Sequence, residues 1–229
     1  VCIYDITEHS LWLCSFFCLH GKEDIMTRNE AVRIIRKKPV PSALEIGFKT
    51  EGYENELERV YIRTAELFDE NANASQALYK HLKQILPSIA FYEALLRITG
   101  NKEKSVAFFD KWALTKIEKI VPAAQSVMKL GLYRKMPDIC DKMLDKLFGP
   151  DAGFESRKVP DAPKFARDMT VCPYYETCKK YGCPEITQFF CKSDDVTYGN
   201  LHPKLVWGRT QTLGMGGECC DFRLYLKEI

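Results

Sequence analysis

The sequence changes character at residues 149–153, Gly-Pro-Asp-Ala-Gly, and this change constrains the fold more than any other feature. Before it, apolar residues recur at helical spacing over long stretches. After it, short apolar runs are separated by prolines, glycines and cysteines, a pattern typical of strands and turns. Because helix and strand signals are segregated along the chain rather than alternating, we predict an α+β fold. A helical N-terminal half would be followed by a small antiparallel sheet with short helices.

The helical half contains several stretches whose apolar residues share one face. Gly100 is a C-cap signal, and Pro122 is interpreted as a break between two helices. The predicted helices cover residues 28–38, 55–69, 75–99, 102–121 and 137–148.

The part after the break reads as short strands and short helices. The turn Gly214-Met215-Gly216-Gly217 predicts a hairpin between the last two strands. We predict strands at residues 164–171, 205–213 and 219–226, and helices at 174–181 and 185–190.

Three regions follow from these patterns. Residues 1–25, rich in aromatic residues and cysteine, precede Met26 and are interpreted as an upstream extension without a functional role. An extra N-terminal helix packed on the core is an equal alternative. Residues 26–150 are the predicted helical region, and residues 151–229 are a cysteine-rich α+β catalytic region packed on those helices.

Charge and composition exclude several classes of protein. Lys and Arg total 33 and Asp and Glu total 31, and no long run of like charge occurs, so a nucleic-acid or membrane surface is not indicated. We therefore expect a small-molecule partner; the oligomeric state is left open. The chain holds 10 cysteines, but the apolar stretch at residues 11–19 lacks the features of a signal peptide. We accordingly predict a cytoplasmic protein with free thiols.

Chemically active side chains are concentrated in the last quarter of the chain. Cys219 and Cys220 follow a glycine-rich turn, and a nearby Arg209 or His202 could activate one of them as a nucleophile. On a strand these two cysteines face opposite sides, so only one of them points into a given pocket. The alternative is that both are small buried apolar residues. The other cysteines of this region are Cys172, Cys178, Cys183 and Cys191.

The polar residues near these cysteines have open alternatives. His202 precedes a predicted strand and is interpreted as a proton-transfer group, or else as an exposed loop histidine. Arg209 suits a substrate carboxylate, although an acidic residue such as Asp221 could pair with it instead. Asp194 and Asp195 are either a solvated pair, metal ligands or a site for a cationic group.

The spacing of Cys172, Cys178, Cys183 and Cys191 does not favour a metal centre. Five, four and seven residues separate them, which fits neither paired C-x-x-C zinc knuckles nor common iron–sulfur runs. We predict no metal and no cofactor. The alternative function is a redox sensor whose cysteines bind a metal, an iron–sulfur cluster or a small ligand.

Four motifs together resemble a known family. They are Cys-Pro-Tyr at 172–174, Phe-Cys-Lys-Ser-Asp-Asp at 190–195, Trp-Gly-Arg-Thr-Gln-Thr-Leu at 207–213 and Gly-Gly-Glu-Cys-Cys-Asp-Phe-Arg at 216–223. The sequence is similar to the bacterial L-2-amino-thiazoline-4-carboxylic acid hydrolase family, most clearly over residues 160–226. The resemblance implies a hydrolase that opens a cyclic isothiourea to N-carbamoyl-L-cysteine, on the way to cysteine.

The resemblance also implies roles for individual residues. Cys220 is the predicted nucleophile, and His202 would protonate the departing sulfur. Direct attack by water with Asp221 as base is the alternative. The cysteine doublet leaves open whether Cys219 or Cys220 matches the family's single cysteine. The predicted substrate-binding residues are Arg209 for the carboxylate, Asp195 or Asp221 for the amidine cation, and Asp194, Cys191 and Gly217.

Overall fold

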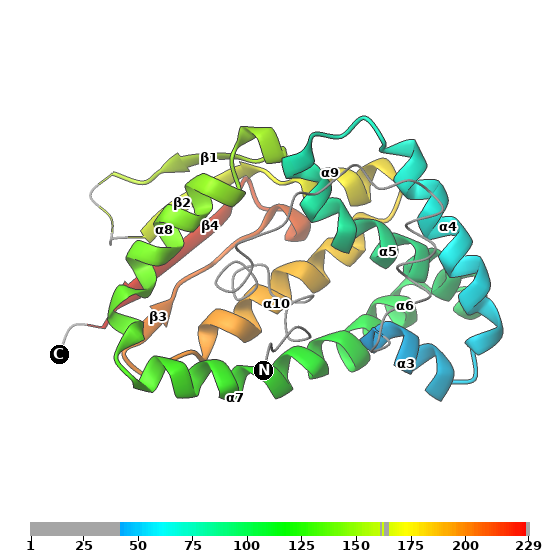
Figure 1. Ribbon diagram of the computed structural model, residues 1–229, viewed down its shortest axis with the longest axis horizontal. Helices are drawn as coiled ribbons and strands as arrows, with labels where there is room; N and C mark the ends of the chain where they lie inside the picture. The colour runs from blue at the N-terminus through cyan, green and yellow to red at the C-terminus, as the bar shows by residue number, and fades with distance from the viewer. Residues whose placement is uncertain (1–41, 161, 163–164, 228–229) are drawn as a thin grey trace.

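The computed structural model describes residues 42–160, 162 and 165–227. The predicted extension at residues 1–25 and the predicted helix at 28–38 lie outside the described residues. Helices fill one end of the molecule, and a small sheet with α8 beside it fills the other (Figure 1). The α helices are α3 (Ala43–Thr50), α4 (Leu57–Glu70), α5 (Gln76–Thr99), α6 (Lys102–Phe109), α7 (Thr115–Lys129), α8 (Met136–Leu147), α9 (Pro173–Lys180) and α10 (Thr187–Gly199).

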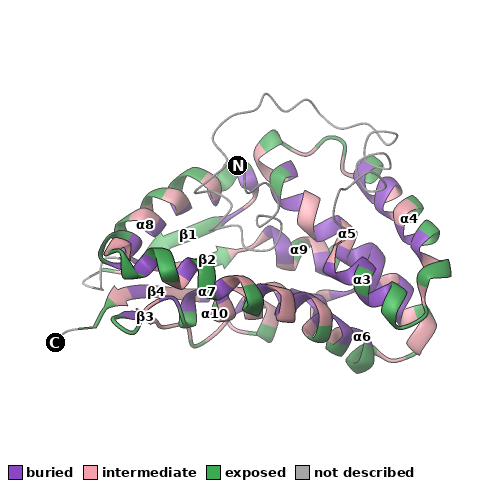
Figure 2. Cartoon of the chain, turned by 60° about the horizontal axis from the view of Figure 1, so that its bottom comes forward, coloured by how far each residue is buried: buried purple, intermediate pink, exposed green. Residues whose placement is uncertain are grey.

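Helix α5 is the central element of the helical end. It begins where the Ser75 side chain accepts a hydrogen bond from the backbone N–H of Leu78, and it ends at Gly100, whose φ of 61° is left-handed. Half of its residues are buried, on more than one face, because α4, α6 and α9 all pack against it. The outer faces of α4 and α8, in contrast, are exposed (Figure 2). No helix among the described residues is long and apolar enough to cross a membrane.

Two predictions about the helical half were wrong in detail. The predicted helix at residues 102–121 is α6, a π-helical turn at Asp110–Leu114, and the first part of α7. Pro122 lies inside α7 rather than between helices, because buried residues on both sides of it, Val121 and Ala124, keep this face on the core. Helix α3 was not predicted, although Ser42 and Glu45 form the capping box that marks its start.

The described strands form an antiparallel four-stranded sheet with the order β1-β2-β4-β3. The strands are β1 (Glu155–Lys158), β2 (Phe165–Val171), β3 (Leu205–Trp207) and β4 (Cys220–Leu226). The exposed β1 was not predicted, because none of its residues is buried to mark an inner face. Strand β3 stops at Trp207 instead of continuing to residue 213. Beyond Trp207, the backbone N–H groups of Thr210 and Gln211 donate to the Asp221 carboxylate rather than to a neighbouring strand.

The two ends share one apolar core. Buried residues run without interruption from Ile85 and Ile89 in α5 to Phe165 and Leu224 in the sheet. Helix α8 packs on β2 and β4, and α10 packs on β3 and α7. The predicted α+β class, with helices mostly in the N-terminal half and a small antiparallel sheet, is confirmed.

Candidate active site

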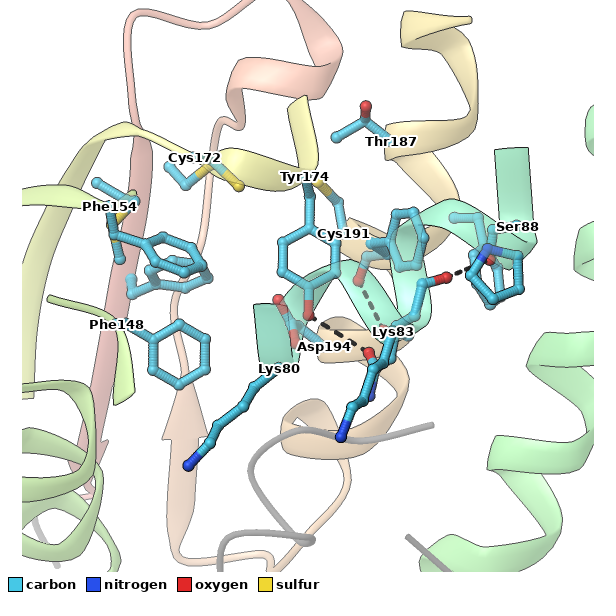
Figure 3. Close-up of a pocket in the computed structure, with 18 of the residues that line it drawn as sticks. Lys80, Lys83, Ser88, Phe148, Phe154, Cys172, Tyr174, Thr187, Cys191 and Asp194 are labelled. Carbon is cyan, nitrogen blue, oxygen red and sulfur yellow. Dashed lines mark hydrogen bonds between the residues drawn. The ribbon is translucent and has the colours of Figure 1, made fainter. Parts of the chain in front are cut away.

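A cavity of about 340 Å³ lies where α5, α8, α9 and α10 meet β2 and β4 (Figure 3). Three cysteines line it: Cys172 just before α9, Cys191 in α10, and Cys220 at the start of β4. Asp194 of α10 and Arg209 of the loop after β3 line it as well. The fold therefore brings thiols, a carboxylate and a guanidinium to one cavity, which includes Cys220 and Arg209 of the predicted site.

Arg209 is held by groups of the protein on several sides. Its Nη2 lies 2.6 Å from an oxygen of Asp195 and donates to the carbonyl of Cys191 at 2.6 Å. Its Nη1 donates to Asp194 at 3.4 Å. The guanidinium also lies over the rings of Trp207 and Phe222, with its carbon 5.7 and 5.6 Å from their centroids. Burial acts to lower the pKa of Arg209, but the two carboxylates raise it overall, so the side chain stays charged.

This arrangement bears on the predicted role of Arg209 as receptor for a substrate carboxylate. The side chain is only 3% exposed, and both hydrogens of Nη2 are used within the protein. Arg209 was predicted to lie within a strand, but it lies in the loop after β3. Its contacts favour a different task, which is to hold Asp194 and to bias its charge.

Asp194 is the carboxylate that lines the cavity. Burial raises its pKa from the ordinary 3.8 to about 7; Arg209 acts in the opposite direction, and the neighbouring Asp195 adds to the rise. The side chain keeps 28% of its surface exposed. A carboxyl group with a pKa near neutrality can take up and release a proton at neutral pH, which is the property a general acid and base needs.

Asp195, next to it on α10, does not line the cavity. It accepts a hydrogen bond from the indole nitrogen of Trp207 at 2.9 Å, pairs with Arg209, and is 51% exposed. The structure thus separates the two acids, which the sequence presented as an adjacent pair.

Cys220 is the first residue of β4, opposite Met169 of β2. Its Sγ accepts a hydrogen bond from the backbone N–H of Leu213 at 3.3 Å. Burial raises its pKa to about 12, although Leu213 and Arg209 act to lower it, so the thiol is protonated at neutral pH. Burial also raises the pKa of Cys172 and of Cys191. Any proton that leaves these thiols needs a nearby acceptor.

The cysteine doublet has a clear geometry. Cys219 is 4% exposed and precedes β4, but it is absent from the cavity lining, whereas Cys220 is 3% exposed and lines it. Neighbouring residues along a strand face opposite sides, which is the arrangement expected for this pair. Cys220 is therefore the member of the pair that a ligand in the cavity can reach.

His202 lies elsewhere, contrary to the expectation that it would accompany the thiol. Its ring stacks on Tyr133 with centroids 3.8 Å apart and an angle of 9° between the planes. Its Nδ1 accepts a hydrogen bond from the backbone N–H of Lys204. The loop before β3 packs on the turn at Leu132–Lys135, and this contact takes the imidazole away from the cavity lining.

Asp221 and Gly217 also lie outside the lining. Asp221 accepts hydrogen bonds from the Thr210 and Gln211 backbone and from the Thr210 hydroxyl. Burial acts to raise its pKa, but these donors lower it overall. A Cβ on Gly217 would lie 2.7 Å from the Gln211 side chain, so this glycine permits close packing within its own loop. Both residues shape the loop that carries Arg209.

Several lining residues lie outside the C-terminal motifs and were not among the predicted site residues. Lys80 and Lys83 of α5 line the cavity, as do Phe148 and Phe154 (Figure 3). Helical periodicity marks such positions as core or surface but not as part of a site. Among the described residues, no group of three or more His, Cys, Asp or Glu side chains is arranged to hold a metal ion.

Comparison with protein-family models matches residues 76–224 to L-2-amino-thiazoline-4-carboxylic acid hydrolase. No curated protein and no solved structure matches the chain. The family match begins at α5 and ends in β4, so it covers more than half of the chain, including both the helices and the strands around the cavity. The chain therefore belongs to the L-2-amino-thiazoline-4-carboxylic acid hydrolase family.

Proposed function

We propose that this protein hydrolyses L-2-amino-thiazoline-4-carboxylate, or a closely related cyclic isothiourea amino acid, to N-carbamoyl-L-cysteine or its counterpart. One observation carries the proposal. Asp194, whose pKa is about 7, and the Cys220 thiol line the same cavity, and Arg209 contacts the acid. The family's name suggests a hydrolase, and these groups suit that chemistry.

The proposed reaction attacks the ring carbon that lies between the sulfur and the nitrogens. This carbon is electrophilic when the amidine is protonated, and an ionised Asp194 would stabilise that cation in the cavity. Water adds to the carbon, and the ring C–S bond breaks. The ring nitrogen keeps its bond to the carbon, so the product is an N-carbamoyl amino acid with a free thiol.

In the first step, Sγ of Cys220 forms a bond to this carbon, and Asp194 accepts the thiol proton. The ring C–S bond then breaks, and the proton passes from Asp194 to the departing sulfur. The substrate is left attached to Cys220 as an open-chain isothiourea. Because burial holds the pKa of Cys220 at about 12, the thiol must lose its proton during attack, which is why a base beside it matters.

In the second step, water adds to the same carbon, and Asp194 accepts its proton. The bond to Sγ breaks, the sulfur regains a proton, and the carbonyl of the product forms. Each step returns Asp194 to its starting state. Arg209 contacts neither the reacting carbon nor the water in this scheme; it positions the acid and sets its charge.

A second route has direct attack by water, with Asp194 as the base and without a bond to Cys220. The raised pKa of Cys220 favours this route. The two routes differ in one measurable species. Acid quenching during turnover, followed by peptide mass spectrometry, would find substrate mass on the Cys220 peptide only in the first route.

The direct test incubates pure protein with L-2-amino-thiazoline-4-carboxylate and detects N-carbamoyl-L-cysteine by mass spectrometry. Cys220→Ser should lower turnover at least about a hundredfold, because the hydroxyl is a far weaker nucleophile in this position. Cys219→Ser is the matched control and should leave turnover near the native value, since Cys219 does not line the cavity. Unchanged thiazoline after incubation with folded native protein would reject the proposed substrate.

A further inference from the structure

One wall of the cavity is apolar, and none of its side chains takes part in the proposed reaction. Leu144 of α8, Phe148, Phe154 and Met169 of β2 form it, and each is less than 10% exposed. Figure 3 shows Phe148 and Phe154 together on one side of the cavity, away from Ser88 on the other. Nothing in the proposed mechanism needs this wall.

Ring contacts hold the wall together. The rings of Phe148 and Phe154 meet edge to face at 5.0 Å, and His81 packs against both at 5.2 and 4.9 Å. His81 is bonded to the Leu147 carbonyl at 2.9 Å, and burial lowers its pKa to about 4, so it is a neutral ring at neutral pH. Ring pairs of this kind stabilise the positions of the side chains that form the wall.

The cavity is larger than a single ring requires. A cavity of about 150 Å³ is enough to hold one benzene ring. This cavity measures about 340 Å³, which is more than twice that volume. Space of that size bounded by aromatic side chains favours an apolar occupant over water, which needs polar partners.

We propose that the cavity takes a cyclic isothiourea amino acid that carries an apolar substituent of about the size of one aromatic ring, and that the wall of Leu144, Phe148, Phe154 and Met169 buries this substituent. The inference rests on the proposed function for the reacting half of the ligand. The part of the inference that concerns the apolar substituent rests on the wall alone.

The experiment compares two ligands by calorimetry on the full-length protein carrying Cys220→Ser, so that little ligand is turned over during the titration. One is L-2-amino-thiazoline-4-carboxylate, and the other is its analogue with a benzyl group on the exocyclic nitrogen. Burial of a phenylalanine-sized group should make the analogue bind at least about tenfold more tightly than the parent acid. Turnover of both compounds is measured separately by mass spectrometry.

A pair of variants on one helix tests the location. Leu144→Phe adds volume to the wall and should remove the analogue's advantage, while binding of the parent acid stays within about twofold. Leu147→Phe is the matched control, because Leu147 lies on α8 but does not line the cavity, and it should keep the advantage. If circular dichroism shows Leu144→Phe to be unfolded, Phe154→Leu replaces it and should weaken binding of the analogue alone.

The outcomes separate this inference from the proposed function. The inference is supported if the analogue binds more tightly than the parent acid and Leu144→Phe abolishes this difference. If neither compound is turned over in that case, only the proposed function fails. Turnover of the parent acid with no tighter binding of the analogue overturns the inference and leaves the function standing. The inference is also overturned if Leu144→Phe weakens the binding of both ligands equally, or if neither ligand binds to the protein without this substitution.

Discussion

Asp194→Asn tests the most specific claim about the site, because it should make the protein more stable and less active at once. The folded protein raises the pKa of Asp194 from 3.8 to about 7. Ionisation is therefore less favourable in the folded state than in the unfolded state. At a pH above both values, this difference costs about 4 kcal/mol of folding free energy, taken as an upper estimate because the side chain is partly exposed.

The sign of the pH dependence follows from the raised value. Below about pH 4, Asp194 is protonated in both states and has no effect on stability; as pH rises from there to about 7, the native protein loses stability. Asparagine cannot ionise, so the variant avoids this loss. Urea denaturation should show Asp194→Asn to be more stable than the native protein by about 2–4 kcal/mol at about pH 8, and the difference should vanish near pH 4.

Activity should change in the opposite direction. Loss of the proton acceptor should lower turnover by about 100- to 10,000-fold. The native enzyme should gain activity as pH rises through about 7, and the variant should lack this rise. Asp195→Asn is the control for turnover, since Asp195 does not line the cavity; its rise in activity should remain but move to lower pH, because Asp195 adds to the raised pKa of Asp194. A destabilised variant at about pH 8, or one with native turnover, would refute the assignment of a raised pKa and a proton-transfer role to Asp194.

Three further variants test the surrounding structure. Arg209→Met removes the cation that lowers the pKa of Asp194, so the rise in activity with pH should shift above 7, as a pH–rate profile would show; an unshifted profile argues against this contact. His202→Gln should keep turnover within about twofold of native, because the ring packs on Tyr133, and a loss beyond about tenfold would place this histidine back in the mechanism. Arg167→Ala should lower the free energy of unfolding by about 1.5–3 kcal/mol in urea, since Arg167 is 5% exposed and bonds Asp141 and Asp145; native stability would contradict this.

Local sequence patterns determined much of the fold. Helical periodicity and the caps at Ser75 and Gly100 define α5 within about a residue, because these interactions lie within the helix itself. All the described strands follow the break at residues 149–153, but helices α9 and α10 follow it as well. The motifs around Arg209 and Cys220 indicated the family, and the match over residues 76–224 confirms it.

Only the tertiary structure decided which of several chemically similar residues line the cavity. The sequence presents Asp194, Asp195 and Asp221 as similar acids. In the structure, Asp194 lines the cavity, Asp195 accepts a hydrogen bond from Trp207, and Asp221 accepts hydrogen bonds from the loop after β3. Their separation depends on the direction of each side chain and on the end of β3, which long-range contacts set. His202 was misplaced for the same reason.

The apolar wall and the pKa of Asp194 are likewise products of packing. Residues from α5, α8 and β2 reach the cavity only after the chain has folded, so no motif links them. Composition and spacing supply the chemical groups, since these are local properties of the chain. The proton affinity of each group depends on how much water and how many charges surround it, and those surroundings exist only in the folded molecule.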